Sequence, residues 1–242
     1  LDDPGYLEFE YVQRIGEVLD AMAPAAPARL AVTHLGGGAG TLARYIAHTR
    51  PGSPQIICEP DAALTELVRA RLPFRRDARV RIRAADARSG IAALRADSAD
   101  AVVLDAYVGA RTPAELTTAE FFADVARVLR PAGVLIANLA DGGPLAYLRR
   151  VLRSVAPSLP HAAIALDPGV RGGRRFGNIV LSASRAPLPI EALRRAAAAA
   201  MFPVAVVAGE QLRALAADAT PFSDADAMRS PAPPADSWRR GG

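Results

Sequence analysis

An apolar run that ends in a cluster of glycines, residues 29–40, constrains this fold more than any other stretch. The run has the length of a buried strand, Gly36 to Gly40 include four glycines, and residues 41–49 have helical periodicity. A strand closed by a glycine-rich turn and a helix start is typical of the first βαβ unit of a nucleotide-binding fold. A second apolar strand then ends at Glu59, near where an acidic residue that contacts a ribose is expected.

The spacing of the glycines separates two kinds of ligand. The dinucleotide fingerprint requires G-x-G-x-x-G, but the sixth position here is Thr41. Gly36, Gly38 and Gly40 instead give G-x-G-x-G, a spacing associated with S-adenosylmethionine-type ligands. Glycines let the backbone approach a ligand, and the helix N-terminus offers unpaired N–H groups. The alternative is a glycine turn that only closes a corner between strand and helix.

Hydrophobic periodicity and turn residues predict an α/β, Rossmann-like fold. Strands are expected at residues 29–35, 54–58, 80–85, 101–104, 134–139, 162–166 and 178–183, and helices at 6–22, 41–49, 61–72, 117–129, 145–155, 189–200 and 210–217, with a short helix near residues 91–94. Residues 169–177 are too few for a crossover helix, so the last two strands should pair antiparallel. The prediction is a seven-stranded, mostly parallel sheet with an antiparallel last strand and helices on both faces.

Length and composition favour one principal domain. A chain of 242 residues with 51% hydrophobic content supports one sizeable core. Residues 1–28 are expected to form an N-terminal helical segment, and residues 29–218 the catalytic domain that binds the S-adenosyl ligand. Residues 219–242 are rich in Pro, Ser, Asp and Ala, and we expect a disordered tail.

Several function classes lack support in the sequence. The formal charge is +4, but all 29 basic residues are Arg, and they are spread along the chain without the aromatic residues that nucleic-acid stacking needs. Charged residues and prolines interrupt every apolar run before membrane-spanning length, so we expect a cytoplasmic protein. Cys58 is the only cysteine, which excludes an intrachain disulfide. His34, His48 and His161 lack ligand spacing, and no metal is assigned.

Marked residues follow four predicted strands: the glycine loop, Glu59, Asp86 and Asp105. The carboxyl ends of parallel strands meet at one edge, so all four should border one crevice. We expect Glu59 to bind ribose hydroxyls and Asp86 with Ala87 to meet adenine. Asp105 would lie nearest the sulfonium carbon, where a carboxylate can attract a cationic donor, orient a nucleophile or accept its proton. The alternative for Asp86 is a turn former or helix cap.

These motifs resemble the spermidine synthase-like (polyamine aminopropyltransferase) family, whose members have a class I methyltransferase-type fold. Residues 35–40 are similar to the family's G-G-G-D-G loop, residues 85–87 to its G-D-A motif, and residues 103–105, with the segment 116–122, to the stretch around its catalytic aspartate. The resemblance implies decarboxylated S-adenosylmethionine as co-substrate and a small-molecule amine as acceptor. It also implies that Asp105 helps to deprotonate the amine, that the loop after it gates the site, and that the protein is a homodimer.

The chain departs from the family pattern at two charged positions. Ala39 stands where the family's loop aspartate binds the aminopropyl ammonium, and Val108 stands where a second carboxylate binds the diamine. The resemblance suggests Tyr11, Gln13 and Tyr107 as residues that bind the acceptor.

Three functions therefore stay open at this point. The first is an aminopropyltransferase with Asp105 as base. The second is a methyltransferase that uses S-adenosylmethionine itself, which Ala39 favours because the loop then leaves more room for a donor carboxylate. The third is a family member without catalytic activity.

Overall fold

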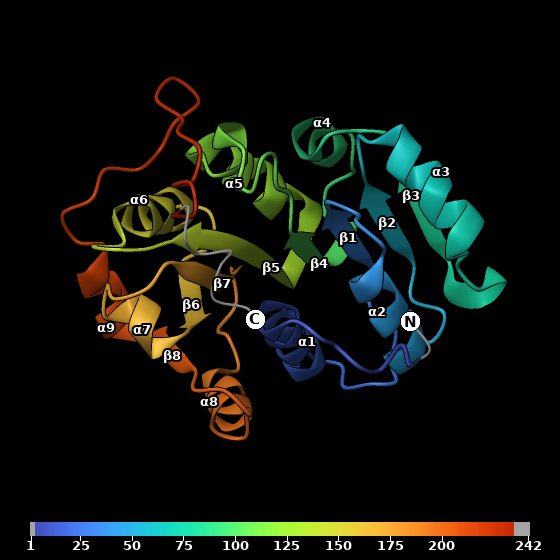
Figure 1. Cartoon of the computed structure of the whole chain (residues 1–242), viewed down its shortest axis with the longest axis horizontal. Coiled ribbons are helices and arrows are strands. Elements are labelled where there is room, and N and C mark those ends of the chain that lie inside the picture. The colour runs from blue at the N-terminus through green and yellow to red at the C-terminus, as the bar shows by residue number, and fades with distance from the viewer. Residues whose placement is uncertain (1–2, 235–242) are drawn as a thin grey trace.

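A computed structural model describes residues 3–234, which form an eight-stranded sheet covered by helices on both faces (Figure 1). The strands are β1 (Val32–Leu35), β2 (Gln55–Cys58), β3 (Val80–Arg83), β4 (Ala99–Leu104), β5 (Leu129–Asp141), β6 (His161–Leu166), β7 (Gly177–Ser184) and β8 (Ala205–Ala208). The helices are α1 (Glu10–Ala21), α2 (Thr41–Thr49), α3 (Ala62–Arg71), α4 (Ala87–Ala92), α5 (Ala119–Val128), α6 (Ala146–Val155), α7 (Pro168–Arg171), α8 (Ile190–Ala198) and α9 (Gly209–Leu215).

The sheet has the order β3-β2-β1-β4-β5-β7-β6-β8, and its first five strands are parallel. β7 is antiparallel to β5 and β6, which confirms the expected pairing of the last two predicted strands. The expectation of seven strands was wrong, because β8 adds an eighth strand antiparallel to β6. An apolar run as short as residues 204–208 is too short to show the two-residue period of a strand. The sequence alone therefore does not identify β8, which is recognised from its pairing with β6.

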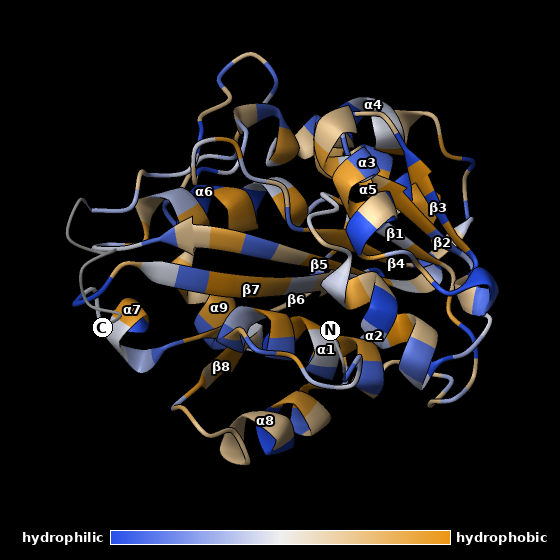
Figure 2. Cartoon of the chain, turned by 45° about the vertical axis from the view of Figure 1, so that its right-hand side comes forward, coloured by the Kyte–Doolittle hydropathy of each residue, from blue (hydrophilic) through white to orange (hydrophobic). Residues whose placement is uncertain are grey.

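The two faces of the sheet bury separate apolar clusters. On β4, Ala101 and Val103 pack with residues of α1 and α2, while Val102 and Leu104 pack with residues of α4, α5 and α6. This alternation follows from the two-residue period of a strand. Figure 2 shows that the strands are largely hydrophobic, whereas the helices carry both kinds of residue. Both faces of the sheet are therefore covered, as a mostly parallel sheet requires.

Strand order creates a crevice at the carboxyl ends of β1 and β4. β1 lies between β2 and β4, and Leu35 at its end pairs with Cys58 on one side and Leu104 on the other. The chain therefore leaves β1 toward one edge of the sheet and returns through β4 on the other side. Ligands of open α/β sheets bind at such a reversal of strand order. The residues that follow Leu35 and Leu104 line this position.

Arg50 fixes α1 against α2. Its side chain is 1% exposed, and its guanidinium donates hydrogen bonds to the carbonyls of Pro24 and Ala28 at 2.7 and 2.8 Å and of Leu19 at 3.0 Å. Carbonyls at a helix end lack partners within the helix, so a buried cation that binds them stabilises the end of α1. The result is a defined position for α1, which carries Tyr11.

Residues 220–234, here called the C-terminal strap, pack against α5, α6 and the loop after β4 (Figure 1). Phe222 is fully buried, 5.5 Å from Tyr147 between ring centroids, and its N–H donates to Ser154 Oγ at 2.7 Å. The disorder expected from residue 219 onward is therefore wrong for the strap. The polar composition concealed one buried aromatic residue and two Asp residues, Asp224 and Asp226, that pair with Arg side chains. Residues 235–242 lie outside the described residues.

Candidate active site

The glycine loop between β1 and α2 has a backbone that only glycine accepts easily. Gly36, Gly38 and Gly40 have φ values of +100°, +48° and +75°. A Cβ on Gly36 would lie 2.3 Å from the backbone oxygen of Asp105, and a Cβ on Gly40 would lie 2.5 Å from the ring of Phe74. A Cβ on Gly38 would meet nothing within 4 Å. The loop is thus packed on the protein at both ends and open in its middle, as close approach of a ligand requires.

Glu59, at the end of β2, ties the glycine loop to the second strand. Its Oε2 accepts a hydrogen bond from the N–H of Gly37 at 2.9 Å, and its Oε1 accepts one from the N–H of Asp61 at 2.9 Å. A carboxylate has about four acceptor positions, so each oxygen keeps one for a hydroxyl group. The geometry therefore fits a ribose diol beside the loop.

A cavity of about 600 Å³ opens in front of this loop. Its walls come from three parts of the chain: residues 36–44, the ends of β1 and β4 with His34 and Asp105, and an N-terminal segment that includes Asp3, Glu8 and Tyr11. The volume lies within the range of typical small-molecule sites. The glycine loop and Asp105 therefore border one space.

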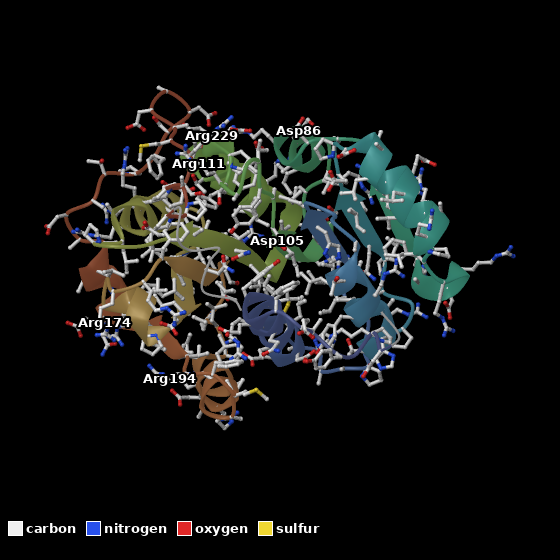
Figure 3. The ribbon with its side chains drawn as sticks, viewed as in Figure 1. Asp86, Asp105, Arg111, Arg174, Arg194 and Arg229 are labelled. Atoms are coloured by element: carbon white, nitrogen blue, oxygen red, sulfur yellow. The ribbon has the colours of Figure 1, made fainter. Side chains whose placement is uncertain are left out.

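Asp105 follows the last residue of β4 and is half-buried, and its label lies near the middle of the view in Figure 3. Its Oδ1 accepts a hydrogen bond from Asn138 Nδ2 at 2.9 Å. Burial raises the pKa of Asp105 above its ordinary value, and the hydrogen bond from Asn138 partly lowers it. A carboxylate in such surroundings is a stronger base than one in water.

Two tyrosines belong to the surroundings of Asp105. Burial, with a smaller effect of the Asp105 charge, raises the pKa of Tyr11 to about 12. The hydroxyl of Tyr107 donates to the backbone oxygen of Asn138 at 3.0 Å, and burial followed by the Asp105 charge raises the pKa of Tyr107 as well. Both phenols are therefore neutral at pH 7 and act as polar, uncharged groups.

His34 contributes a neutral imidazole to the cavity. Its Nε2 lies 2.9 Å from Gln55 Oε1, while Gln55 Nε2 donates to the carbonyl of Ala43 at 2.9 Å. That orientation makes the Gln55 oxygen an acceptor, so the proton of the imidazole lies on Nε2. Burial lowers the pKa of His34 to about 4. No group of three or more His, Cys, Asp or Glu suited to a metal ion occurs within residues 3–234.

Five predicted site residues do not line the cavity, and one of them is Glu59, which borders a separate small pocket with Gly37 and Gly38 on the other side of the loop. Asp86 caps α4, where its carboxylate accepts from Ser89 N–H at 2.8 Å and from Ser89 Oγ at 2.6 Å. Figure 3 shows Asp86 at the periphery, well away from Asp105. Ala87 is buried in the core, and Tyr107 contacts β5. Gln13 donates to the carbonyl of Leu7 at 2.7 Å and so holds the N-terminal segment that lines the cavity.

The sequence interpretation missed three polar residues that line the cavity or contact Asp105. Asp3 and Glu8 reach the cavity from the N-terminal segment, which no local motif connects with the sheet. Asn138 is the single strongly polar residue in the apolar run 134–140, so the sequence alone could have identified it as a candidate site residue. A buried polar side chain within a strand requires a partner.

Comparisons with known proteins agree with the fold and the motifs. A family model described as a methyltransferase domain matches residues 33–137. A polyamine aminopropyltransferase from Vibrio vulnificus (strain CMCP6) is 32% identical over 114 residues, which are 46% of this chain and 38% of that relative. The crystal structure of a probable spermidine synthase from Corynebacterium glutamicum ATCC 13032 is 34% identical with a TM-score of 0.86, covering 93% of this chain and 83% of that one. Human methyltransferase-like protein 13, at 19% identity, TM-score 0.61 and coverage of 90% and 96%, shares the fold alone.

The sheet order and the glycine loop thus define a protein of the class I methyltransferase fold. Within it, the match to the Corynebacterium structure is close and covers nearly the whole chain. The chain belongs to the spermidine synthase-like family of transferases. Across residues 3–234, no helix combines the length and apolarity needed to cross a membrane.

Proposed function

We propose that this protein is an aminopropyltransferase that moves the aminopropyl group of decarboxylated S-adenosylmethionine to a cationic amine. The observation that carries the proposal is the shared cavity, which the glycine loop and Asp105 both line. The Vibrio relative, named a polyamine aminopropyltransferase, and the Corynebacterium structure, titled a probable spermidine synthase, support the same reaction.

The charges around the cavity favour a cationic acceptor. Among the described residues that line the cavity, Asp3, Glu8 and Asp105 supply carboxylates and Arg44 supplies a guanidinium. The guanidinium of Arg44 already donates hydrogen bonds to the carbonyls of Leu72 and Pro73, so these donors are not available to a ligand. Asp3 and Glu8 therefore compensate for the second carboxylate that Val108 replaces in the loop after β4.

Asp105 acts as the general base of the proposed reaction. An alkylammonium ion cannot attack until it loses a proton, and Asp105 accepts that proton as the amine nitrogen approaches the donor. The nitrogen bonds to the aminopropyl carbon attached to sulfur, and the carbon–sulfur bond breaks with its electron pair going to the sulfonium. The products are the aminopropylated amine and neutral 5′-methylthioadenosine. In this proposal Glu59 binds the ribose, and Asp86 with Ala87 lies toward the adenine.

A methyltransferase that uses S-adenosylmethionine is the second candidate, and Ala39 is the observation that favours it. The glycine loop carries no carboxylate at this exposed position, so nothing in the loop repels the carboxylate of S-adenosylmethionine. The match of residues 33–137 to a methyltransferase domain is equally compatible with this reaction.

The proposal extends to polyamine biosynthesis in the cytoplasm by a homodimer. Met201 and Phe202 are 89% and 51% exposed beside the edge strand β8, which gives an apolar surface for a second copy. Light scattering of the purified protein measures the oligomeric state, and a monomer at micromolar concentration contradicts this part of the proposal.

Calorimetry with both donors, followed by mass spectrometry of amine products, tests the proposed function. We expect tighter binding of decarboxylated S-adenosylmethionine and a product heavier by one aminopropyl group. Tighter binding of S-adenosylmethionine with a methylated product selects the second candidate, and no binding of either donor leaves a non-catalytic protein. Ala39→Asp is the matched variant, because restoring the loop carboxylate should shift preference further toward the decarboxylated donor.

A further inference from the structure

Asn138 connects β5 with the proposed base and has no assigned function. Its side chain is 2% exposed near the carboxyl end of β5, with Nδ2 2.9 Å from Asp105 Oδ1. Its Oδ1 is buried and has no hydrogen-bond partner within residues 3–234. A buried polar atom without a partner costs free energy, so an asparagine here is unfavourable for stability alone.

The contact with Asn138 is the one hydrogen bond that the Asp105 carboxylate makes within the described part of the chain. From residues 3–234, no hydrogen bond reaches its Oδ2. A carboxylate held at one oxygen has a fixed orientation and leaves the other oxygen available to a proton. Asn138 is itself held in place, because its backbone oxygen accepts from Tyr107 and its strand pairs with β7.

We propose that Asn138 is a positioning residue whose amide keeps Asp105 ionised and oriented, with Oδ2 directed to the proton of the attacking amine. This inference rests on the proposed function. Asn138 acts through Asp105 and does not itself touch the reacting atoms.

The other groups that face Asp105 are not positively charged, so they do not stabilise its ionised form. Tyr11 from α1 and Tyr107 from the loop after β4 are neutral at pH 7 because burial raises the pKa of each phenol. His34 from β1 is also neutral, because burial lowers its pKa. The remaining charged groups of the N-terminal segment that line the cavity are Asp3 and Glu8, and neither carries a positive charge that would favour ionisation of Asp105. The amide of Asn138 is therefore the contact that favours the ionised form.

Asn138→Leu tests the proposal because leucine has a similar size but no donor. Asn138→Val is a second variant with a smaller, β-branched side chain in case the first does not fold. Ser182→Ala is the matched control, since Ser182 is also 2% exposed, lies on the adjacent strand β7, and does not line the cavity. Carbon-13 NMR of aspartate-labelled protein follows the carboxyl of Asp105, assigned by its absence in Asp105→Asn.

We expect the titration midpoint of Asp105 to move to higher pH in both Asn138 variants and to stay unchanged in Ser182→Ala. Transfer at pH 7 should fall about 10- to 100-fold, with the acid limb of the pH–rate profile shifted in the same direction and donor affinity retained. An unchanged or lower midpoint in both variants overturns the proposal. If the wild type transfers no aminopropyl group, the proposed function fails, but the NMR titration still decides whether Asn138 controls Asp105.

Discussion

Gly36 is the position where the glycine loop lies closest to the proposed base, and Gly36→Ala should damage both stability and activity. A Cβ at this position would lie 2.3 Å from the backbone oxygen and 2.8 Å from the carbonyl carbon of Asp105. These atoms belong to the backbone, so no side-chain rotation relieves the contact. The end of β4 must move away, and Asp105 with it.

Gly38→Ala is the matched control, because it separates the cost of the contact with the Asp105 backbone from the cost of a positive φ. Gly38 also has a positive φ, +48°, but a Cβ there would meet nothing within 4 Å. Gly38→Ala costs about 1 to 2 kcal/mol for a left-handed alanine, and Gly36→Ala costs at least as much, because φ +100° lies beyond the left-handed region that alanine can adopt. Gly36→Ala adds overpacking against backbone, about 1 to 3 kcal/mol. For a chain of this size the difference corresponds to roughly 2 to 12 °C in Tm.

Differential scanning calorimetry of the two variants measures this difference, and isothermal titration with 5′-methylthioadenosine measures the state of the loop. We expect Gly36→Ala to melt below Gly38→Ala and to lose transfer activity more severely. Equal melting temperatures, or a lower one for Gly38→Ala, would refute the reasoning that Gly36 is required by contact with Asp105.

Three further predictions concern the base, the ribose site and the strap. Asp105→Asn should abolish transfer and retain donor binding. Burial raises the pKa of Asp105, so the folded chain favours the protonated acid and loses stability as pH rises. Asp105→Asn removes this penalty and should therefore raise Tm more at pH 8 than at pH 4. An equal change in Tm at both pH values contradicts this. Glu59→Gln should weaken 5′-methylthioadenosine binding about tenfold in a calorimetric titration, because a charge-assisted hydrogen bond becomes neutral; unchanged affinity removes Glu59 from the ribose site. Phe222→Ala should cost about 3 to 5 kcal/mol of unfolding free energy, measured by urea denaturation, whereas a change below about 1 kcal/mol would show that the strap does not pack as described.

Local patterns made the centre of this fold predictable. The strand, glycine turn and helix at residues 29–49 are a contiguous signal, and Glu59 and Asp105 follow apolar runs that are long enough to identify as strands. The prediction that the glycine loop and Asp105 meet required only the rule that parallel strands end at one edge. The cavity that both line agrees with that rule.

Features that depend on distant partners were not predictable in the same way. The hydrogen bond between Asp105 and Asn138 joins residues 33 positions apart, and Glu8 reaches the cavity through the fold of the N-terminal segment. β8 is too short to show a period. The strap was predicted wrongly because average composition conceals single buried residues such as Phe222, whose contacts come from the distant helices α5 and α6.

The strap also determines when the loop after Asp105 can reach its final form. Ser230 pairs with Thr112 in both directions, through Thr112 N–H to Ser230 Oγ at 2.9 Å and Ser230 N–H to the Thr112 carbonyl at 3.2 Å, and Arg111 donates to the Ser230 carbonyl. Figure 3 labels Arg111 close to Arg229, the residue before Ser230. Thr112 and Ser230 are separated by 118 residues. During synthesis on the ribosome, the backbone of this loop therefore gains these hydrogen bonds only after Ser230 has emerged. A translation product that stops before residue 220 would contain the glycine loop and Asp105 but lack the contacts of the strap. The apolar surface that the strap covers would then be exposed to proteases and chaperones.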